Sequence, residues 1–180
     1  DVYIDLKENK KGIHMSRIIE SINEVVESNN LSKSIEEIEL KILDTLRSKH
    51  EFNIGEININ THYFITKPTI NTKKFTHEAY EITISVIKEN NMDYKKIRTT
   101  VIGNTLCPHS LNMTKGKSHI QRAQLIVEIK TEYDSNIDIE EIINKCEDSF
   151  TTPTYTLLKS PDEAELVDKM FDNGKFVEDV

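Results

Sequence analysis

Alternation between apolar and polar residues constrains the fold of this chain more than any other feature of its sequence. The alternation is clearest at 57–65, 80–86 and 123–129, and a further strand-like run covers 97–106. Successive side chains of a β-strand point to opposite faces, so such runs predict strands with one buried face. A short strand at 2–6 follows the same pattern. We therefore expect β-strands along much of the chain.

Other stretches repeat their apolar residues at helical spacing. Two helices are expected at 15–28 and 35–49, and the capping-box pattern at 34–37 opens the second one. Further helical stripes lie at 139–146 and 164–171. The order of elements is therefore β, α, α, β, β, followed by β, β, α, α. This order predicts an α+β protein with the helical stripes in its core.

The bulk composition excludes several classes of protein. With 180 residues the chain can form one domain or two small ones, and no apolar run approaches the length of a membrane span. A net charge of −8 argues against an extended nucleic-acid surface. The N-terminus lacks the pattern of a signal peptide, and two cysteines are too few for a disulfide scaffold. We expect a cytoplasmic protein with no membrane or nucleic-acid partner.

The stretch 105–122 concentrates the residues best suited to chemistry. It is a polar connection between two predicted strands and holds Cys107, His109 and His119. Thiolate and imidazole are ligand types that bind zinc or ferrous iron. With a carboxylate from elsewhere, three ligands would leave a position for a water of lowered pKa. A fourth protein ligand would instead close a structural site, and chance alone can also bring one cysteine and two histidines this close.

A small basic patch surrounds the expected start of the first helix. Helix N-termini carry free N–H groups and a positive dipole end, so the patch could receive an anion. The alternative is a solvated loop with a helix cap, which polar loops of this kind commonly form. The patch consists of Lys10, Lys11, Gly12, His14 and Arg17.

Three residues near the end of the helix expected at 139–146 could also carry function. Cys146 lies on the apolar stripe, which favours a buried small side chain over a ligand. Glu147 and Asp148 follow it, and carboxylates oppose the dipole at a helix C-terminus. A solvated helix end is the simpler interpretation, although the unfavourable position invites a functional one.

Five separated motifs, in order along nearly the whole chain, make the sequence resemble the type IB GTP cyclohydrolases, most closely their archaeal, Fe(II)-dependent branch. The resemblance implies a tunnelling fold, in which two ββααββ modules per chain contribute to barrels assembled between subunits. It also implies a homo-oligomer, typically a homotetramer, with active sites at subunit interfaces. The motifs are Lys11-Gly-Ile-His-Met-Ser-Arg17, Cys107-Pro-His-Ser110, Ser118-His-Ile-Gln-Arg122, Tyr155-Thr-Leu-Leu-Lys-Ser-Pro-Asp-Glu163 and Lys175-Phe-Val-Glu-Asp179.

The resemblance implies that the enzyme opens the guanine imidazole ring of GTP at C8, releases formate and recloses the product to a dihydropterin. In the archaeal branch the product is 7,8-dihydroneopterin 2′,3′-cyclic phosphate, on the route to methanopterin. In the bacterial branch it is 7,8-dihydroneopterin triphosphate, on the route to folate. Another tunnelling-fold enzyme acting on a pterin or purine, and a non-enzymatic oligomer braced by metal, remain the alternatives.

By position in the motifs, the resemblance makes Cys107 and His119 metal ligands. The family's acidic ligand corresponds best to Glu147, with Asp148 as the neighbouring alternative. The expected metal is Fe(II), and the same ligand types also accept Zn(II) or Mn(II). Because the metal would activate the attacking water, Cys107 is also expected to be essential for catalysis.

The resemblance also implies residues that contact the substrate. Glu163 matches the carboxylate that anchors the guanine edge, where it can accept two N–H bonds. His14 and Arg17 match the first-module motif, with a phosphate or ribose contact as the expected role. His109 is expected to shuttle protons, because the free pKa of histidine lies near neutral pH.

The sequence departs from the family pattern at three places. His109 stands where bacterial members usually carry a second cysteine, and Ser160 stands where arginine is commoner. Family members also continue through two more strands with a further histidine motif. We therefore expect a complete first module at 1–95 and a second, incomplete module at 96–180 that carries the metal site.

Overall fold

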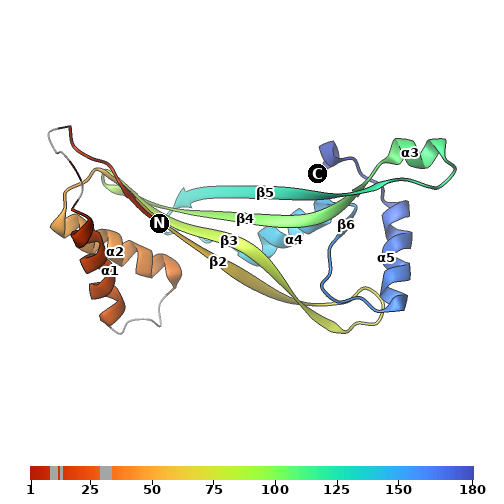
Figure 1. The fold of residues 1–180 in the computed structure, drawn as a ribbon, viewed down its shortest axis with the longest axis horizontal. Helices are drawn as coiled ribbons and strands as arrows, with labels where there is room; N and C mark the ends of the chain where they lie inside the picture. Colours follow the sequence, from red (N-terminus) through yellow and green to blue (C-terminus); the bar gives the residue numbers. More distant parts are fainter. Residues whose placement is uncertain (9–11, 13, 29–33) are drawn as a thin grey trace. The chain divides into compact units, whose positions relative to one another are not determined.

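The computed structural model describes residues 1–8, 12, 14–28 and 34–180, and Figure 1 shows how its elements follow one another. Strands and helices alternate in blocks, which confirms the predicted α+β class. The elements are β1 (Val2–Ile4), α1 (Met15–Glu27), α2 (Ile35–Lys49), β2 (Ile54–Pro68), β3 (Phe75–Glu89), β4 (Met92–Leu106), α3 (Pro108–Met113), β5 (Ile120–Glu132), α4 (Ile139–Ser149), β6 (Thr152–Pro153), α5 (Ser160–Asp172) and the 3₁₀ turn η1 (Val177–Asp179).

All six described strands belong to one sheet, in which the order is β1-β2-β3-β4-β5 and β6 pairs with β4. β1 runs antiparallel to β2 with Val2 opposite Ile57, and β6 runs antiparallel to β4 with Gly103 opposite Pro153. Short turns join β2 to β3 and β3 to β4, as the sequence predicts. The tunnelling fold and its two modules remain predictions.

One expectation about local structure needs correction. The connection after β4 is not a loop throughout, because Pro108 opens the six-residue helix α3. Proline favours the first turn of a helix, where its missing N–H costs nothing. Pro153 lies in the two-residue strand β6, which pairs with β4.

Contacts divide the chain into two compact units. The first contains 1–61, 82–98 and 128–136, and the second contains 62–81, 99–127 and 137–180. Strands β2 to β5 therefore contribute residues to both units. The two modules predicted at 1–95 and 96–180 divide the chain by its order of elements and not by contacts. The division into these modules remains a prediction.

The core of the first unit forms where α1 and α2 pack against residues of β1, β2 and β3. The stripe of α2 supplies much of this core, as helical spacing predicts. The stripe expected on α1 is buried only in part: Ile18 is buried, whereas Met15, Ile19 and Val26 are exposed. The hydroxyl of Ser34 accepts a hydrogen bond from the N–H of Glu37 and caps α2 as the capping-box pattern predicts. The buried residues are Ile18, Ile42, Leu43, Leu46, Phe52, Ile57 and Val86.

The core of the second unit lies between α4 and the sheet. Cys146 is buried there, in agreement with its expected role as a small apolar side chain. Phe150 packs so tightly on Gly103 that an added Cβ would lie 2.2 Å from a ring carbon of Phe150. The cluster contains Ile65, Tyr80, Val101, Ile143, Cys146 and Phe150.

The helices in the described ranges are too short or too polar to cross a lipid bilayer.

Candidate functional site

Cys107 lies where β4 passes into α3. Its Sγ accepts a hydrogen bond from the backbone N–H of Ser110 at 3.4 Å, so the thiol caps the helix. The hydroxyl of Ser118 donates to the carbonyl of Cys107 at 2.7 Å and draws the far end of the connection back towards it. Cys107 is half-buried.

His109 and His119 are both exposed, His109 on α3 and His119 immediately before β5. The chain reverses between them at Lys115 and Gly116, whose φ angles are 57° and 101°. Glycine adopts positive φ angles at the lowest cost, and Gly116 occupies the position with the larger positive φ. Together, the reversal and the bond from Ser118 place the residue next to His119 against the backbone of Cys107.

Glu147 lies in the last turn of α4, where its carboxylate is almost buried. The Nζ of Lys67 lies 2.5 and 2.6 Å from the two carboxylate oxygens, and the hydroxyl of Tyr80 donates to one of them at 2.5 Å. Burial and the Glu147 carboxylate raise the pKa of Tyr80 far above its usual range, so the phenol keeps its proton. The cluster satisfies a carboxylate that would be costly to bury alone.

The residues fit a metal ion only in part. Cys107 and His119 have the donor chemistry of an Fe(II) or Zn(II) site, and both are accessible. Within residues 1–8, 12, 14–28 and 34–180, however, the structure brings together no group of three or more His, Cys, Asp or Glu side chains suited to a metal. Glu147 is occupied by Lys67 and Tyr80. A complete three-ligand set is therefore not assembled by this part of a single chain.

Glu147 and Asp148 line a cavity of about 380 Å³ between the end of α4 and α5. Tyr155 and Lys169 also line it. Burial and the negative charge of Glu147 raise the pKa of the Tyr155 phenol, which therefore stays protonated at neutral pH. Asp148 is exposed, in keeping with the solvated helix end that the sequence allows.

Glu163 lies exposed in the first turn of α5, and its backbone N–H donates to the carbonyl of Lys159 at 2.9 Å. The preceding residue, Asp162, is fully buried. Its carboxylate accepts hydrogen bonds from the backbone N–H groups of Asn71 and Thr72, both at 2.8 Å. The sequence interpretation missed Asp162, although an acidic residue at the third position of a helix is a recognised capping signal.

A second buried carboxylate, that of Glu78, binds Thr156, in the segment that leads from β6 to α5. Glu78 lies on β3 and accepts hydrogen bonds from the backbone N–H of Thr156 at 3.0 and 3.2 Å and from its hydroxyl at 3.0 Å. Thr76 also donates to it at 3.0 Å. The sequence interpretation missed this contact as well, because the partners are 78 residues apart and share no local pattern.

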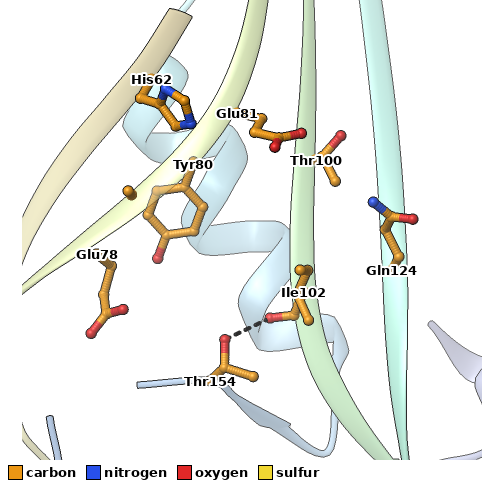
Figure 2. A pocket seen from close by; sticks show the side chains of 9 residues that line it. His62, Glu78, Tyr80, Glu81, Thr100, Ile102, Gln124 and Thr154 are labelled. Atoms are coloured by element: carbon orange, nitrogen blue, oxygen red, sulfur yellow. Dashed lines mark hydrogen bonds between the residues drawn. The ribbon is translucent and has the colours of Figure 1, made fainter. Parts of the chain in front are cut away.

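Glu78 also lines the pocket shown in Figure 2, a hollow of about 280 Å³. His62, Glu81 and Gln124 supply polar groups around it, and the hydroxyl of Thr154 donates to the carbonyl of Ile102 at 3.2 Å. His62 is exposed on β2. Cys107, His119 and Glu147 do not line this pocket, although Tyr80, which does, donates a hydrogen bond to Glu147.

In the first unit, His14 is the exposed N-cap residue of α1, and its ring centroid lies 6.4 Å from that of His50. Arg17 Nη1 donates to the carbonyl of Lys49 at 2.9 Å, which places a cation at the C-terminal end of α2. This contact gives Arg17 a structural role. Lys10 and Lys11 of the predicted basic patch lie outside the described residues.

Most of the predicted site residues belong to the second compact unit, and two belong to the first. Cys107 and His119 flank one connection, and Glu147 and Glu163 lie on α4 and α5 of the same unit. His14 and Arg17 belong to the first unit. The predicted roles of these residues remain predictions.

Comparison with known proteins matches the chain along its whole length. The family model described as type I GTP cyclohydrolase folE2 covers residues 1–180. The GTP cyclohydrolase MptA of Pyrococcus abyssi is 42% identical over 186 residues, which are 100% of this chain and 70% of that protein. The MptA of Thermococcus kodakarensis is 43% identical with the same coverage. The GTP cyclohydrolase FolE2 of Thermotoga maritima is 35% identical over 98% of this chain and 65% of its own length.

Proposed function

Because this chain belongs to the type I GTP cyclohydrolase folE2 family, we propose that it is a GTP cyclohydrolase of methanopterin biosynthesis. The observation that carries this function is the match along residues 1–180 together with identities of 42–43% to proteins named GTP cyclohydrolase MptA. The reaction opens the guanine imidazole ring of GTP at C8 and releases formate. The expected product is 7,8-dihydroneopterin 2′,3′-cyclic phosphate.

A second product is the specific alternative. Relatives named GTP cyclohydrolase FolE2 are 32–35% identical over 98–100% of the chain. If the chain acts as the bacterial branch is expected to act, the product is 7,8-dihydroneopterin triphosphate. The higher identity to the MptA proteins supports the cyclic phosphate. Both products require the same attack at C8, so the two alternatives differ only in the fate of the triphosphate.

We infer that Fe(II) is the metal, with Zn(II) or Mn(II) as alternatives, and that Cys107 and His119 hold it. A divalent ion at this position would activate water for attack on C8. Glu147 is the proposed third ligand and Asp148 the neighbouring alternative. The pairing of Glu147 with Lys67 means that its carboxylate would have to exchange one cation for another. The donor chemistry of Cys107 and its place at the start of the connection that leads to His119 support the assignment.

Glu163 is the proposed anchor for the guanine base. Its exposed carboxylate can accept hydrogen bonds from N1–H and the 2-amino group, a bidentate arrangement that only a purine with both donors satisfies. His109, exposed on α3 beside Cys107, is the proposed proton carrier. His14 and Arg17 are proposed to contact phosphate or ribose. For Arg17 this requires guanidinium donors beyond the one that binds Lys49.

We propose that the active enzyme is a homotetramer with sites between subunits. The exposure of Glu163 and His119 supports this, because hydrogen bonds to a base discriminate best where water is excluded. Mixing a Cys107→Ala protein with a Glu163→Gln protein would test it. If sites are shared between subunits, the mixture regains activity that neither variant has alone. A mixture that stays inactive after subunit exchange would contradict shared sites.

Anaerobic reconstitution with Fe(II), Mn(II) or Zn(II), followed by incubation with GTP, tests the function as a whole. Formate release and a product mass matching the cyclic phosphate are expected, and Cys107→Ala should abolish both. If Cys107→Ala released formate at the normal rate, the proposed mechanism would be wrong. If no metal supported turnover but chelation lowered the melting temperature, the protein would be a metal-braced oligomer without this activity.

A further inference from the structure

The buried carboxylate of Asp162 connects two elements that lie far apart in the sequence. Besides the two backbone N–H bonds from Asn71 and Thr72, it accepts a bond from the hydroxyl of Thr72 at 2.7 Å and one from the backbone N–H of Lys159 at 3.1 Å. Asn71 and Thr72 form the turn between β2 and β3, and Lys159 is the N-cap residue of α5. One side chain therefore fixes the turn and the first turn of α5 together.

These four bonds are those of an ionised carboxylate. Burial alone would raise the pKa of Asp162, but the hydrogen bonds from Thr72, Asn71 and Lys159 outweigh it and hold the pKa below its usual range. The side chain is fully buried and has no freedom to serve a ligand directly. Its neighbour Glu163 is exposed, so the two acids of the Pro-Asp-Glu motif have opposite environments.

The segment that precedes α5 is fixed at its other end by Glu78, through three bonds from Thr156. The turn residues and Glu78 both belong to the hairpin formed by β2 and β3. The hairpin therefore holds the stretch from Thr156 to Asp162 at two points. Glu163 follows directly after the second of them, so its backbone position depends on the bonds of Asp162.

We propose that Asp162 is a positioning residue for base recognition: by binding the β2–β3 turn, it sets the direction in which Glu163 presents its carboxylate to guanine. This inference rests on the proposed function, in which Glu163 anchors the base. A carboxylate that accepts two N–H bonds must be placed to within a few tenths of an ångström, and a shift of the first turn of α5 misaligns both bonds. Selectivity for guanine over hypoxanthine is then a property of the hairpin as well as of Glu163.

The test compares the binding of GTP and of inosine triphosphate, which lacks the 2-amino group, to the full protein by calorimetry. In the wild type, GTP should bind more tightly because the second N–H bond is available only to guanine. Asp162→Asn removes the charge and places amide hydrogens against the N–H groups of the turn. We expect the ratio of the two affinities to fall at least fivefold. A purely structural role would weaken both nucleotides equally and leave the ratio unchanged, which would overturn the inference.

Three further variants keep the result decisive. Glu163→Gln should abolish the selectivity itself. If it does not, the proposed anchor is wrong and the inference falls with it, whereas selectivity lost in Glu163→Gln but kept in Asp162→Asn overturns the inference alone. Thr72→Val removes a single bond to Asp162 and should lower the ratio in the same direction, which decides the matter if Asp162→Asn fails to fold. Glu165→Gln, which alters the exposed contacts with the Asn71 side chain and with Lys169 but none of the bonds to Asp162, should leave the ratio unchanged.

Discussion

Lys67 and Glu147 form an almost buried ion pair between β2 and α4, with their side chains 16% and 10% exposed and Lys67 Nζ 2.5 Å from the nearer carboxylate oxygen. Their partner Tyr80 donates to the same carboxylate. A carboxylate with this little water around it requires a cation, and Lys67 supplies it in the structure. The same carboxylate is the proposed third ligand of a metal, so the charge balance of Glu147 decides both the stability of the second unit and its capacity for metal.

Replacing Lys67 with methionine should destabilise the protein by about 3 kcal/mol, because it leaves Glu147 buried without a counter-charge. Urea unfolding measured without metal tests this prediction. Lys145→Met is the matched control. It breaks an exposed pair with Glu141 on the same helix as Glu147, and should leave the free energy of unfolding close to that of the wild type. Equal effects of the two substitutions would mean that the buried pair contributes nothing.

Metal content should depend on Cys107 and His119 separately. Cys107→Ser and His119→Ala are each expected to lower the bound Fe(II) or Zn(II) per chain at least tenfold, because each removes one of few ligands. Elemental analysis after dialysis measures the loss, and circular dichroism checks the fold. Cys146→Ala is the control, since this thiol is buried on α4 and should not bind metal. Retention of metal by Cys107→Ser would refute the assignment.

Glu147→Gln separates the two roles of this residue. If Glu147 becomes a ligand by exchanging Lys67 for the metal, the variant should also lose metal in the same dialysis. An unchanged metal content would move the third ligand elsewhere, with Asp148→Asn as the next variant to measure. Either result can be obtained without measuring turnover, so it stands independently of the proposed reaction.

The sequence predicts the helices well because their signals are local. Apolar spacing and the cap at Ser34 place α2 to the residue, and apolar spacing also places the start of α4, although that helix continues three residues past the predicted end. Strands β2 to β5 are longer than predicted, since their ends carry polar residues such as Thr66 and Lys67 that break the alternation while the ladder continues, whereas β1 ends two residues early. A prediction from alternating apolar and polar residues therefore ends a strand too early, because hydrogen bonding to a neighbouring strand does not require apolar side chains.

The site divides in the same manner. Cys107 at the end of a strand and the polar connection to His119 follow from residues close together in the sequence. The pairing of Glu147 with Lys67 does not, since the partners are 80 residues apart and meet only in the folded sheet. Asp162 and its turn, 91 residues away at Asn71, are a second example. Long-range polar contacts of this kind leave no periodic trace in a single sequence.

Glu39 should make the first unit less stable as pH rises. Its side chain is fully buried on α2, and burial together with the charge of Glu36 raises its pKa to about 8. In the unfolded chain this carboxyl ionises near pH 4.5. The contribution of Glu39 to the free energy of unfolding is therefore fully present below that pH and is lost as pH rises towards 8, at about 1.4 kcal/mol per pH unit.

Glu39→Gln should therefore reduce the difference in unfolding free energy between pH 5 and pH 8 by about 3 kcal/mol. Urea unfolding at a series of pH values measures it. Glu27→Gln, on the exposed end of α1, should leave the pH dependence as it is in the wild type. A parallel pH dependence in wild type and Glu39→Gln would show that Glu39 is ionised in the folded protein.

Gly103→Ala should destabilise the second unit by about 2–3 kcal/mol, because the new methyl group would overlap the ring of Phe150 in a core with no room to move. Phe150→Leu makes space at this point, so the alanine substitution should cost at least about 1 kcal/mol less in that background. Gly12→Ala, where no atom of the described residues beyond its chain neighbours lies within 4 Å of the added carbon, is the control. If Gly103→Ala costs the same with Phe150 and with Leu at position 150, strand conformation and not the ring explains the glycine.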